Sequence, residues 1–275
     1  MELSFIKLSP NGNMTLLVET PVPRNRQLAI GKRLIATDHV GAEQAGFIEP
    51  ACHPQAVARL QMMAGEFCGN ATLSLACWLF SKEHPNPGEQ AEIHLEVSGA
   101  DAPVSCRITK QAQGYLGTLS MPLPQRVTTK TYWLNGRSYA LQTVELPGIH
   151  HIIVPKALWG EQAKQMAELA AAQWDIPSEA FGILLFDADT MTLEPLVCVK
   201  GVSLIWEHGC GSGTTAVGAA LALQQQSSLT LQLKQTGGVM EITAQYHEHQ
   251  LTALYLTVQI QIVATGIAHL ESCGK

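Results

Sequence analysis

The chain has 275 residues, of which 46% are hydrophobic and 15% are charged, and its formal net charge is −6. This composition is typical of a folded globular protein and excludes a disordered, low-complexity chain. Lysine and arginine are scattered singly, with no basic stripe that could follow phosphates, so we expect no nucleic-acid partner and no anionic membrane partner. The length exceeds the commonest single-domain size and favours two domains.

The cysteines and the N-terminal residues indicate a cellular compartment. The sequence MELSFIKLSPNGN lacks the basic and apolar regions of a signal peptide, and no apolar run is long enough for a membrane span, so we expect a cytoplasmic protein. The cysteines show no CxxC pair, which favours reduced thiols over a disulfide framework and gives no support for a metal site; they stand at positions 52, 68, 77, 106, 198, 210 and 273.

Short β-rich runs dominate the chain, and four helical patterns interrupt them. The strand-like runs cover residues 3–9, 15–20, 45–49, 91–99, 114–121, 183–187, 229–236, 239–246 and 251–263, and the helical patterns cover 25–36, 70–80, 157–174 and 212–224. Each half of the chain repeats one order: strands, a helix, two more strands, a Cys-Gly loop, a small-residue helix and hairpin-like strands. The sequence therefore predicts an internal duplication.

The two Cys-Gly loops occupy equivalent places in these repeats, 142 residues apart at Cys68 and Cys210. We predict one domain from residues 1–124 together with 264–275, and a second domain from 125–263, with prolines interrupting the strand pattern near the boundary. Two similar halves pack naturally about a pseudo-twofold axis. Such an axis would bring both loops to an interdomain cleft, which is where ligands usually bind.

Each loop places a cysteine directly before a helix, and that position has consequences for its chemistry. The first amides of a helix have no internal acceptor, so together with the helix dipole they bind an anion such as a carboxylate, and Gly69 and Gly211 permit close approach. The same partial positive charge lowers the pKa of an adjacent thiol from about 8.5. We predict a pair that holds one thiolate and one thiol, titrating as a unit.

A thiolate and a thiol on opposite faces of an amino acid can invert its α-carbon. The thiolate removes the α-proton, the opposite thiol supplies another, and the roles exchange in the reverse direction. Preorganised amide donors would meet the charge that develops on the carboxylate, so no cofactor is required. Two other readings fit the same cysteines: a reversible redox pair, and an amino-acid-binding module in which neither thiol reacts.

The chain resembles the diaminopimelate epimerase and proline racemase superfamily, and within it the histidine racemases of opine-type metallophore pathways. The stretches that carry this resemblance are SPNGNMTLLV, HVGAEQAGFIE, GEFCGNATLSL, SLIWEHGCGSGT and VATGIAHLE, in order and along the whole chain. The resemblance implies an α/β (α+β) fold of two pseudo-symmetric domains, each a barrel-like, mostly antiparallel sheet around a central helix. It further implies an isomerase with no metal, no cofactor and a homodimeric assembly, whose D-amino acid product passes to an opine-forming synthase.

The resemblance also assigns residues. Cys68 and Cys210 match the catalytic pair. The residues that match substrate-binding positions of the family are Asn13, Glu43, Gln44, Gly69, Asn70, His151, Glu207, Gly211 and Ser212. His150 precedes His151 in a strand, and alternation lets only one of the two face a cleft.

The departures from diaminopimelate epimerase concern the substrate. That family has an arginine after the glutamate to hold a distal carboxylate, whereas this chain has His208, and its first loop reads CGNATLS without the family's arginine. Diaminopimelate is therefore disfavoured. The resemblance implies histidine as the substrate, with diaminobutyrate or another basic amino acid as the alternative. A phenazine-biosynthesis-like isomerase shares the duplicated fold but lacks the cysteine pair, and it has a histidine where this chain has Asn70.

Overall fold

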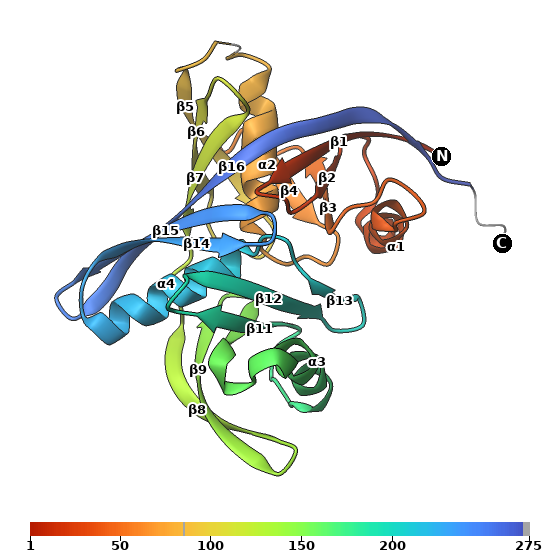
Figure 1. Cartoon of the computed structure of the whole chain (residues 1–275). Coiled ribbons are helices and arrows are strands. Elements are labelled where there is room, and N and C mark those ends of the chain that lie inside the picture. The colour runs from red at the N-terminus through yellow and green to blue at the C-terminus, as the bar shows by residue number, and fades with distance from the viewer. Residues whose placement is uncertain (85, 272–275) are drawn as a thin grey trace. The chain divides into compact units, whose positions relative to one another are not determined.

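The computed structural model describes residues 1–84 and 86–271, and Figure 1 shows its elements. In chain order they are β1 (Glu2–Pro10), β2 (Thr15–Val18), α1 (Arg24–Ile35), β3 (Gln44–Glu49), β4 (Ala58–Met62), α2 (Gly69–Ser81), β5 (Gln90–Val97), β6 (Val104–Lys110), β7 (Tyr115–Met121), β8 (Arg126–Leu134), β9 (Arg137–Leu146), β10 (Ile149–Pro155), the 3₁₀ turns Lys156–Leu158 and Gly160–Gln162, α3 (Ala163–Gln173), β11 (Ala180–Asp187), β12 (Thr192–Val199), β13 (Ser203–Trp206), α4 (Gly211–Gln225), β14 (Leu229–Gln235), β15 (Gly238–His247) and β16 (Gln250–His269).

The chain divides into two compact units: Met1–Leu119 with the described part of Thr257–Lys275, and Ser120–Leu256. The sequence predicts the boundary at 124/125 and the return of the chain at 264. In the first unit the strands form a ring in the order β1-β2-β3-β4-β5-β6-β7-β16, and the pairing of β1 with β16, from Glu2↔His269 to Pro10↔Ile260, closes it. The helix α2 contacts each strand from β1 to β6, so it is the central helix of this ring.

The second unit repeats the strand order of the first. Its series runs β9-β10-β11-β12-β14-β15-β16, with β8 beside β9 and the short β13 beside β12. The pairs β10–β11 and β12–β14 are parallel, as are their counterparts β2–β3 and β4–β5 in the first unit. The pairs β11–β12 and β3–β4 are likewise both antiparallel. The predicted duplication and the mixed, sheet-dominated fold are therefore confirmed, with a closed ring in the first unit and an open series in the second.

The central helices α2 and α4 have compositions that suit burial on all sides. Nine consecutive residues of α2, from Gly69 to Cys77, are buried. In α4 small residues allow close approach to the sheet, because a Cβ added to Gly218 would lie 2.7 Å from the side chain of Ile242. Both helices therefore pack closely against the strands around them.

The outer helices α1 and α3 bury only one face. In α1 the buried residues are Gln27, Ile30, Gly31 and Leu34, and in α3 they are Ala163, Ala167 and Ala170. The helix predicted over 157–174 is only partly correct, because the chain makes two 3₁₀ turns before α3 begins at Ala163. Gly160 has φ +55°, a left-handed conformation that interrupts a right-handed helix.

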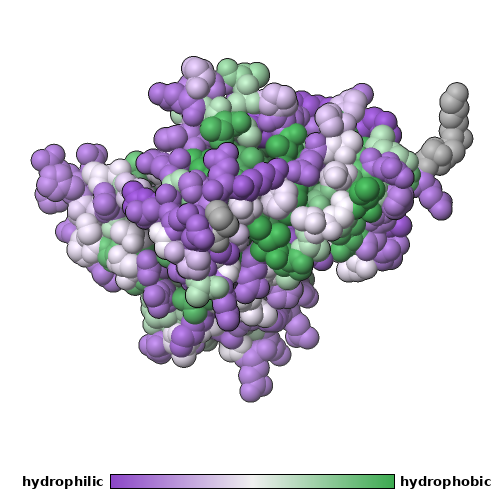
Figure 2. Space-filling model, turned by 90° about the horizontal axis from the view of Figure 1, so that it is seen from above, coloured by the Kyte–Doolittle hydropathy of each residue, from purple (hydrophilic) through white to green (hydrophobic). Residues whose placement is uncertain are grey.

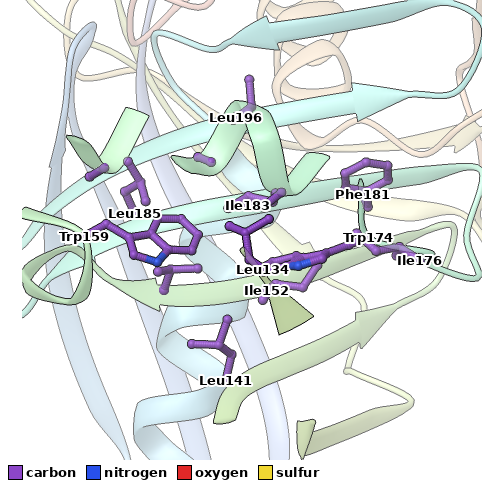
Figure 3. Close-up of a cluster of buried hydrophobic side chains, with 14 residues drawn as sticks. Leu134, Leu141, Ile152, Trp159, Trp174, Ile176, Phe181, Ile183, Leu185 and Leu196 are labelled. Carbon is purple, nitrogen blue, oxygen red and sulfur yellow. The ribbon is translucent and has the colours of Figure 1, made fainter. Parts of the chain in front are cut away.

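The core of the second unit is aromatic between α3 and its strands. Trp159 and Trp174 pack with their ring centroids 6.2 Å apart, and Figure 3 shows them among Ile183, Leu185 and other aliphatic side chains. On the face drawn in Figure 2, hydrophilic side chains surround smaller apolar patches. Among the described residues, no helix is long and apolar enough to cross a membrane.

Candidate active site

The two cysteines singled out by the sequence occupy the same position in the two units. Cys68 is the N-cap of α2 and Cys210 is the N-cap of α4, both with extended backbone. The Sγ atom of Cys68 accepts a hydrogen bond from the backbone amide of Ala71 at 3.4 Å, and that of Cys210 accepts one from Gly213 at 3.3 Å. Each sulfur therefore lies at the positive end of a buried helix, which favours its thiolate form.

A threonine four residues after each cysteine completes the matching geometry. The hydroxyl of Thr72 donates to the carbonyl of Cys68 at 2.7 Å, and that of Thr214 donates to the carbonyl of Cys210 at 2.8 Å. These bonds fix the peptide that carries each thiol. The threonines were visible in the CGNAT and CGSGT motifs, but the sequence did not reveal this role.

Around Cys68, a chain of amides presents a carbonyl oxygen to the thiol. The carboxylate of Glu43 only accepts, so Asn13 turns its Nδ2 toward it, at 2.9 Å. The Oδ1 of Asn13 then accepts from Nε2 of Gln44 at 2.7 Å, and Gln44 turns its Oε1 toward Cys68, whose Sγ donates to it at 2.9 Å. In its thiol form, Cys68 therefore has an acceptor for its proton in Gln44.

This network lies in strands that the sequence places far apart. Asn13 follows the β1–β2 turn and is fully buried, while Glu43 and Gln44 stand at the start of β3. Thr15 on β2 accepts a second hydrogen bond from Nε2 of Gln44, at 2.8 Å. Thr15 was not predicted, and only the pairing of β2 with β3, Thr15↔Gln44, places it at the site.

Around Cys210, a buried glutamine ties the loop to the sheet. The amide of Cys210 donates to Oε1 of Gln235 at 2.8 Å, and Nε2 of Gln235 donates to the hydroxyl of Thr214 at the same distance. Gln235 ends β14, so no sequence motif identified it. Its two bonds hold both ends of the first turn of α4.

The hydroxyl of Ser212 lies between a histidine and the second cysteine. Its Oγ is 2.9 Å from Nε2 of His151 and 3.5 Å from Sγ of Cys210. The ring of His151 packs against Gly182, its partner on β11, where an added Cβ would collide with Nδ1. The neighbouring His150 pairs with Glu145 on β9. The strand thus directs His151, and not His150, toward the loop of Cys210.

Burial has the largest effect on the pKa values of His151 and Cys210. Burial lowers the pKa of His151 to about 3, so its imidazole is neutral at physiological pH. The pKa of the Cys210 thiol is raised, first by burial and then by the nearby negative charge of Glu207, while hydrogen bonds from Ser212 and Gly213 lower it. A thiolate at Cys210 therefore depends on the donors around its sulfur.

The structure groups the predicted residues by unit. Asn13, Glu43, Gln44, Cys68, Gly69 and Asn70 lie in the first unit, and His151, Glu207, Cys210, Gly211 and Ser212 lie in the second. Gly69-Asn70 and Gly211-Ser212 form the first residues of α2 and α4, the positions from which helix amides reach an anion. The described residues contain no cluster of three or more His, Cys, Asp or Glu side chains suited to a metal ion.

The remaining cysteines contrast with this pair. Burial raises the pKa of the Cys77 and Cys106 thiols to about 12, and neither caps a helix. Both are core residues, whereas Cys198 is only partly buried.

Comparison with known proteins identifies the family. The sequence profile described as "Histidine racemase CntK N-terminal domain" matches residues 2–269. The chain belongs to the histidine racemase family. A curated histidine racemase of Staphylococcus aureus is 32% identical over 275 residues, covering 98% of each chain. A histidine racemase of Fusobacterium nucleatum is 27% identical over 274 residues, covering 98% of this chain and 97% of the relative.

Solved structures show the fold of this histidine racemase family member in more distant proteins. A probable proline racemase from Agrobacterium radiobacter has a TM-score of 0.69 at 13% identity, covering 98% of this chain and 93% of that one. A hydroxyproline epimerase from Agrobacterium vitis also has a TM-score of 0.69, at 11% identity, covering 99% and 94%. These structures confirm the expected fold, and the sequence profile and curated relatives confirm the amino-acid racemase class.

Proposed function

We propose that this protein interconverts L- and D-histidine by a two-base transfer of the α-proton between Cys68 and Cys210, without a cofactor. The observation that carries the proposal is the equivalence of the two cysteines, each capping the central helix of its unit. The family membership and the relatives named as histidine racemases support histidine as the substrate.

In this mechanism the substrate carboxylate binds the first amides of α2 and α4, at Gly69-Asn70 and Gly211-Ser212. These amides have no acceptor within the helix, and they bind more strongly as negative charge builds on the carboxylate after the α-proton leaves. One sulfur takes the proton from one face while the other delivers a proton to the opposite face. In the reverse direction the two sulfurs exchange roles, so both are required in each direction.

The substrate's amino group and side chain are assigned to the remaining polar residues. We propose that Asn13, Glu43 and Gln44 bind from the first unit, and Glu207 from the second, with Glu43 favouring a ring that carries an N–H donor. The carboxylate of Glu43 is held in place by Asn13 at 2.9 Å, which keeps one of its oxygens oriented. A neutral imidazole would bind this carboxylate through its N–H group.

The test is to incubate the reduced protein with single L- and D-amino acids in deuterated water and to follow α-proton loss and chirality. The wild type is expected to exchange and racemise histidine, and Cys68→Ser and Cys210→Ser are each expected to lose at least a thousandfold in kcat. Cys52→Ser is the matched control, because Cys52 is exposed and outside the site.

Each outcome of this experiment has a distinct interpretation. Racemisation of diaminobutyrate or another basic amino acid in place of histidine would overturn the substrate assignment and keep the two-base mechanism. An active Cys68→Ser or Cys210→Ser variant would overturn the mechanism. Absence of exchange with every amino acid under reducing conditions would leave the redox or binding functions as the explanation.

We further propose a reducing, cytoplasmic location, a homodimer, and consumption of the D-histidine by an opine-forming synthase of a metallophore pathway. The location follows from the need for free thiols, and the other two follow from the resemblance to metallophore histidine racemases. Light scattering of the purified protein tests the dimer. Loss of the metallophore on deletion of the gene, with recovery on supplied D-histidine, tests the pathway.

A further inference from the structure

A continuous line of hydrogen-bonding atoms runs from β10 to the second cysteine. It consists of Nε2 of His151, Oγ of Ser212 and Sγ of Cys210, with separations of 2.9 Å and 3.5 Å. His151 is completely buried, and the serine stands on the first turn of α4. A hydroxyl has one proton, so the direction of this line depends on which group donates to which.

The environment of the imidazole decides that direction. Among the described residues, Nδ1 of His151 is buried and has no hydrogen-bond partner. A proton on Nδ1 would be a buried donor without an acceptor, which is costly, whereas an unprotonated Nδ1 has only unused lone-pair electrons. The neutral ring therefore carries its proton on Nε2 and donates it to Ser212. The hydroxyl of Ser212, occupied as an acceptor, then directs its own proton toward Cys210.

A donor at this position matters because the surroundings of Cys210 otherwise oppose a negative sulfur. The thiol is 3% exposed and lies close to the carboxylate of Glu207. The groups that offer a hydrogen to its Sγ are the amide of Gly213 and the hydroxyl of Ser212. The two-base reaction nevertheless requires Cys210 to be a thiolate in one of its two states.

We propose that Ser212, oriented by His151, is a positioning residue that donates its hydroxyl proton to the thiolate of Cys210. This inference rests on the proposed function, and it changes the role that the sequence gives to His151. The imidazole acts on the sulfur through Ser212 and not by contact with the amino side of the substrate. Gly182 is part of the same arrangement, because only a residue without a side chain leaves room for the imidazole ring of His151.

The first unit has different residues at the equivalent positions. The residue equivalent to Ser212 is Asn70, and Sγ of Cys68 donates a hydrogen bond to Oε1 of Gln44. At Cys210, burial and the carboxylate of Glu207 raise the pKa of the thiol, and the hydroxyl of Ser212 opposes that effect.

The first test measures the thiolate itself and needs no catalysis. The rate at which iodoacetamide alkylates Cys210, followed by peptide mass spectrometry from pH 7 to 9, is proportional to its thiolate fraction. Because a hydrogen bond to a charged group contributes one to two pH units, Ser212→Ala is expected to slow alkylation at least about tenfold. Ser212→Thr should restore it. His151→Phe should slow it similarly, whereas His150→Phe, altering the adjacent residue on β10, should not.

The second test separates action through Ser212 from direct contact with substrate. Ser212→Ala and His151→Phe are each expected to lower kcat for histidine about tenfold with little change in KM, and the double variant should lose no more than the more severe single variant. If the fold-losses in kcat of the two single variants multiplied in the double variant, the proposal would be overturned. A Ser212→Ala alkylation rate within threefold of wild type would also overturn it. Failure of racemisation in the wild type would instead refute the proposed function and leave the alkylation result standing.

Discussion

At the scale of single residues, His151 shows how neighbours determine what a titratable group does. It alternates with His150 along β10, and the pairing with Gly182 turns its ring toward Ser212. Complete burial lowers its pKa to about 3, so it neither carries charge nor exchanges protons near neutral pH. His151, which the resemblance places among the substrate-binding residues, is therefore proposed to act as a neutral hydrogen-bond donor to Ser212.

This burial predicts a pH dependence of stability. The pKa of His151 is lowered in the folded state relative to about 6.5 in the unfolded chain, so unfolding takes up a proton below pH 6.5. The stabilisation is present above pH 6.5 and is lost as pH falls toward 3. Between pH 6.5 and 5 the wild type should lose about 1.5 kcal/mol more unfolding free energy than His151→Phe. Urea unfolding at each pH measures this difference, and equal losses would contradict a buried neutral ring.

At the scale of elements, the two cysteines proposed as catalytic are also the N-caps of α2 and α4. Each sulfur accepts one amide hydrogen bond of the first turn. Sulfur is a weak acceptor, and serine is among the preferred N-cap residues. The proposed mechanism therefore requires a weaker N-cap at both positions than helix stability alone would favour.

Because each cysteine both caps a helix and is proposed to react with the substrate, serine and alanine substitutions should differ in their effects on activity and on stability. Cys68→Ser and Cys210→Ser should keep the unfolding free energy within about 1 kcal/mol of wild type or raise it, because the hydroxyl caps the helix. Cys68→Ala and Cys210→Ala should lose about 1 kcal/mol or more. Denaturant unfolding of the four variants provides the measurement. If the serine variants lost several kcal/mol, their inactivity would be structural and not chemical.

The sequence predicted the bounds of some helices more accurately than those of others. Three of the four helices begin and end within a residue of their predicted bounds, because periodic apolar residues and a Cys-Gly start mark them. The prediction over 157–174 was wrong at its beginning, since Gly160 has a left-handed backbone that a composition pattern does not reveal.

At the scale of the whole molecule, the first unit needs the end of the chain. Its ring closes only when the C-terminal part of β16 pairs with β1, over 250 residues away in sequence. In this unit, Ile260 on β16 is fully buried and packs near Gly117, whereas Val263 is 50% exposed.

This closure predicts that substitutions at two positions of β16 differ strongly in their effect on stability. Ile260→Asp should destabilise the first unit by more than about 3 kcal/mol, because it buries an unpaired carboxylate, whereas Val263→Asp should cost less than about 1 kcal/mol. Hydrogen exchange of the β1 amides reports the opening of the ring, and it should rise strongly only in Ile260→Asp. Equal protection of β1 in both variants would show that β16 does not hold the first unit closed.

The sequence by itself determined the duplication, the two cysteines and the family, because these depend on order, spacing and local motifs. It also identified Asn13, Glu43, Gln44 and Ser212 as candidates, through resemblance. Only the tertiary structure decided what these side chains bond, and it alone brought in Thr15 and Gln235. Their hydrogen bonds join strands that are distant in sequence, and the direction of each bond depends on burial and on the neighbouring donors and acceptors.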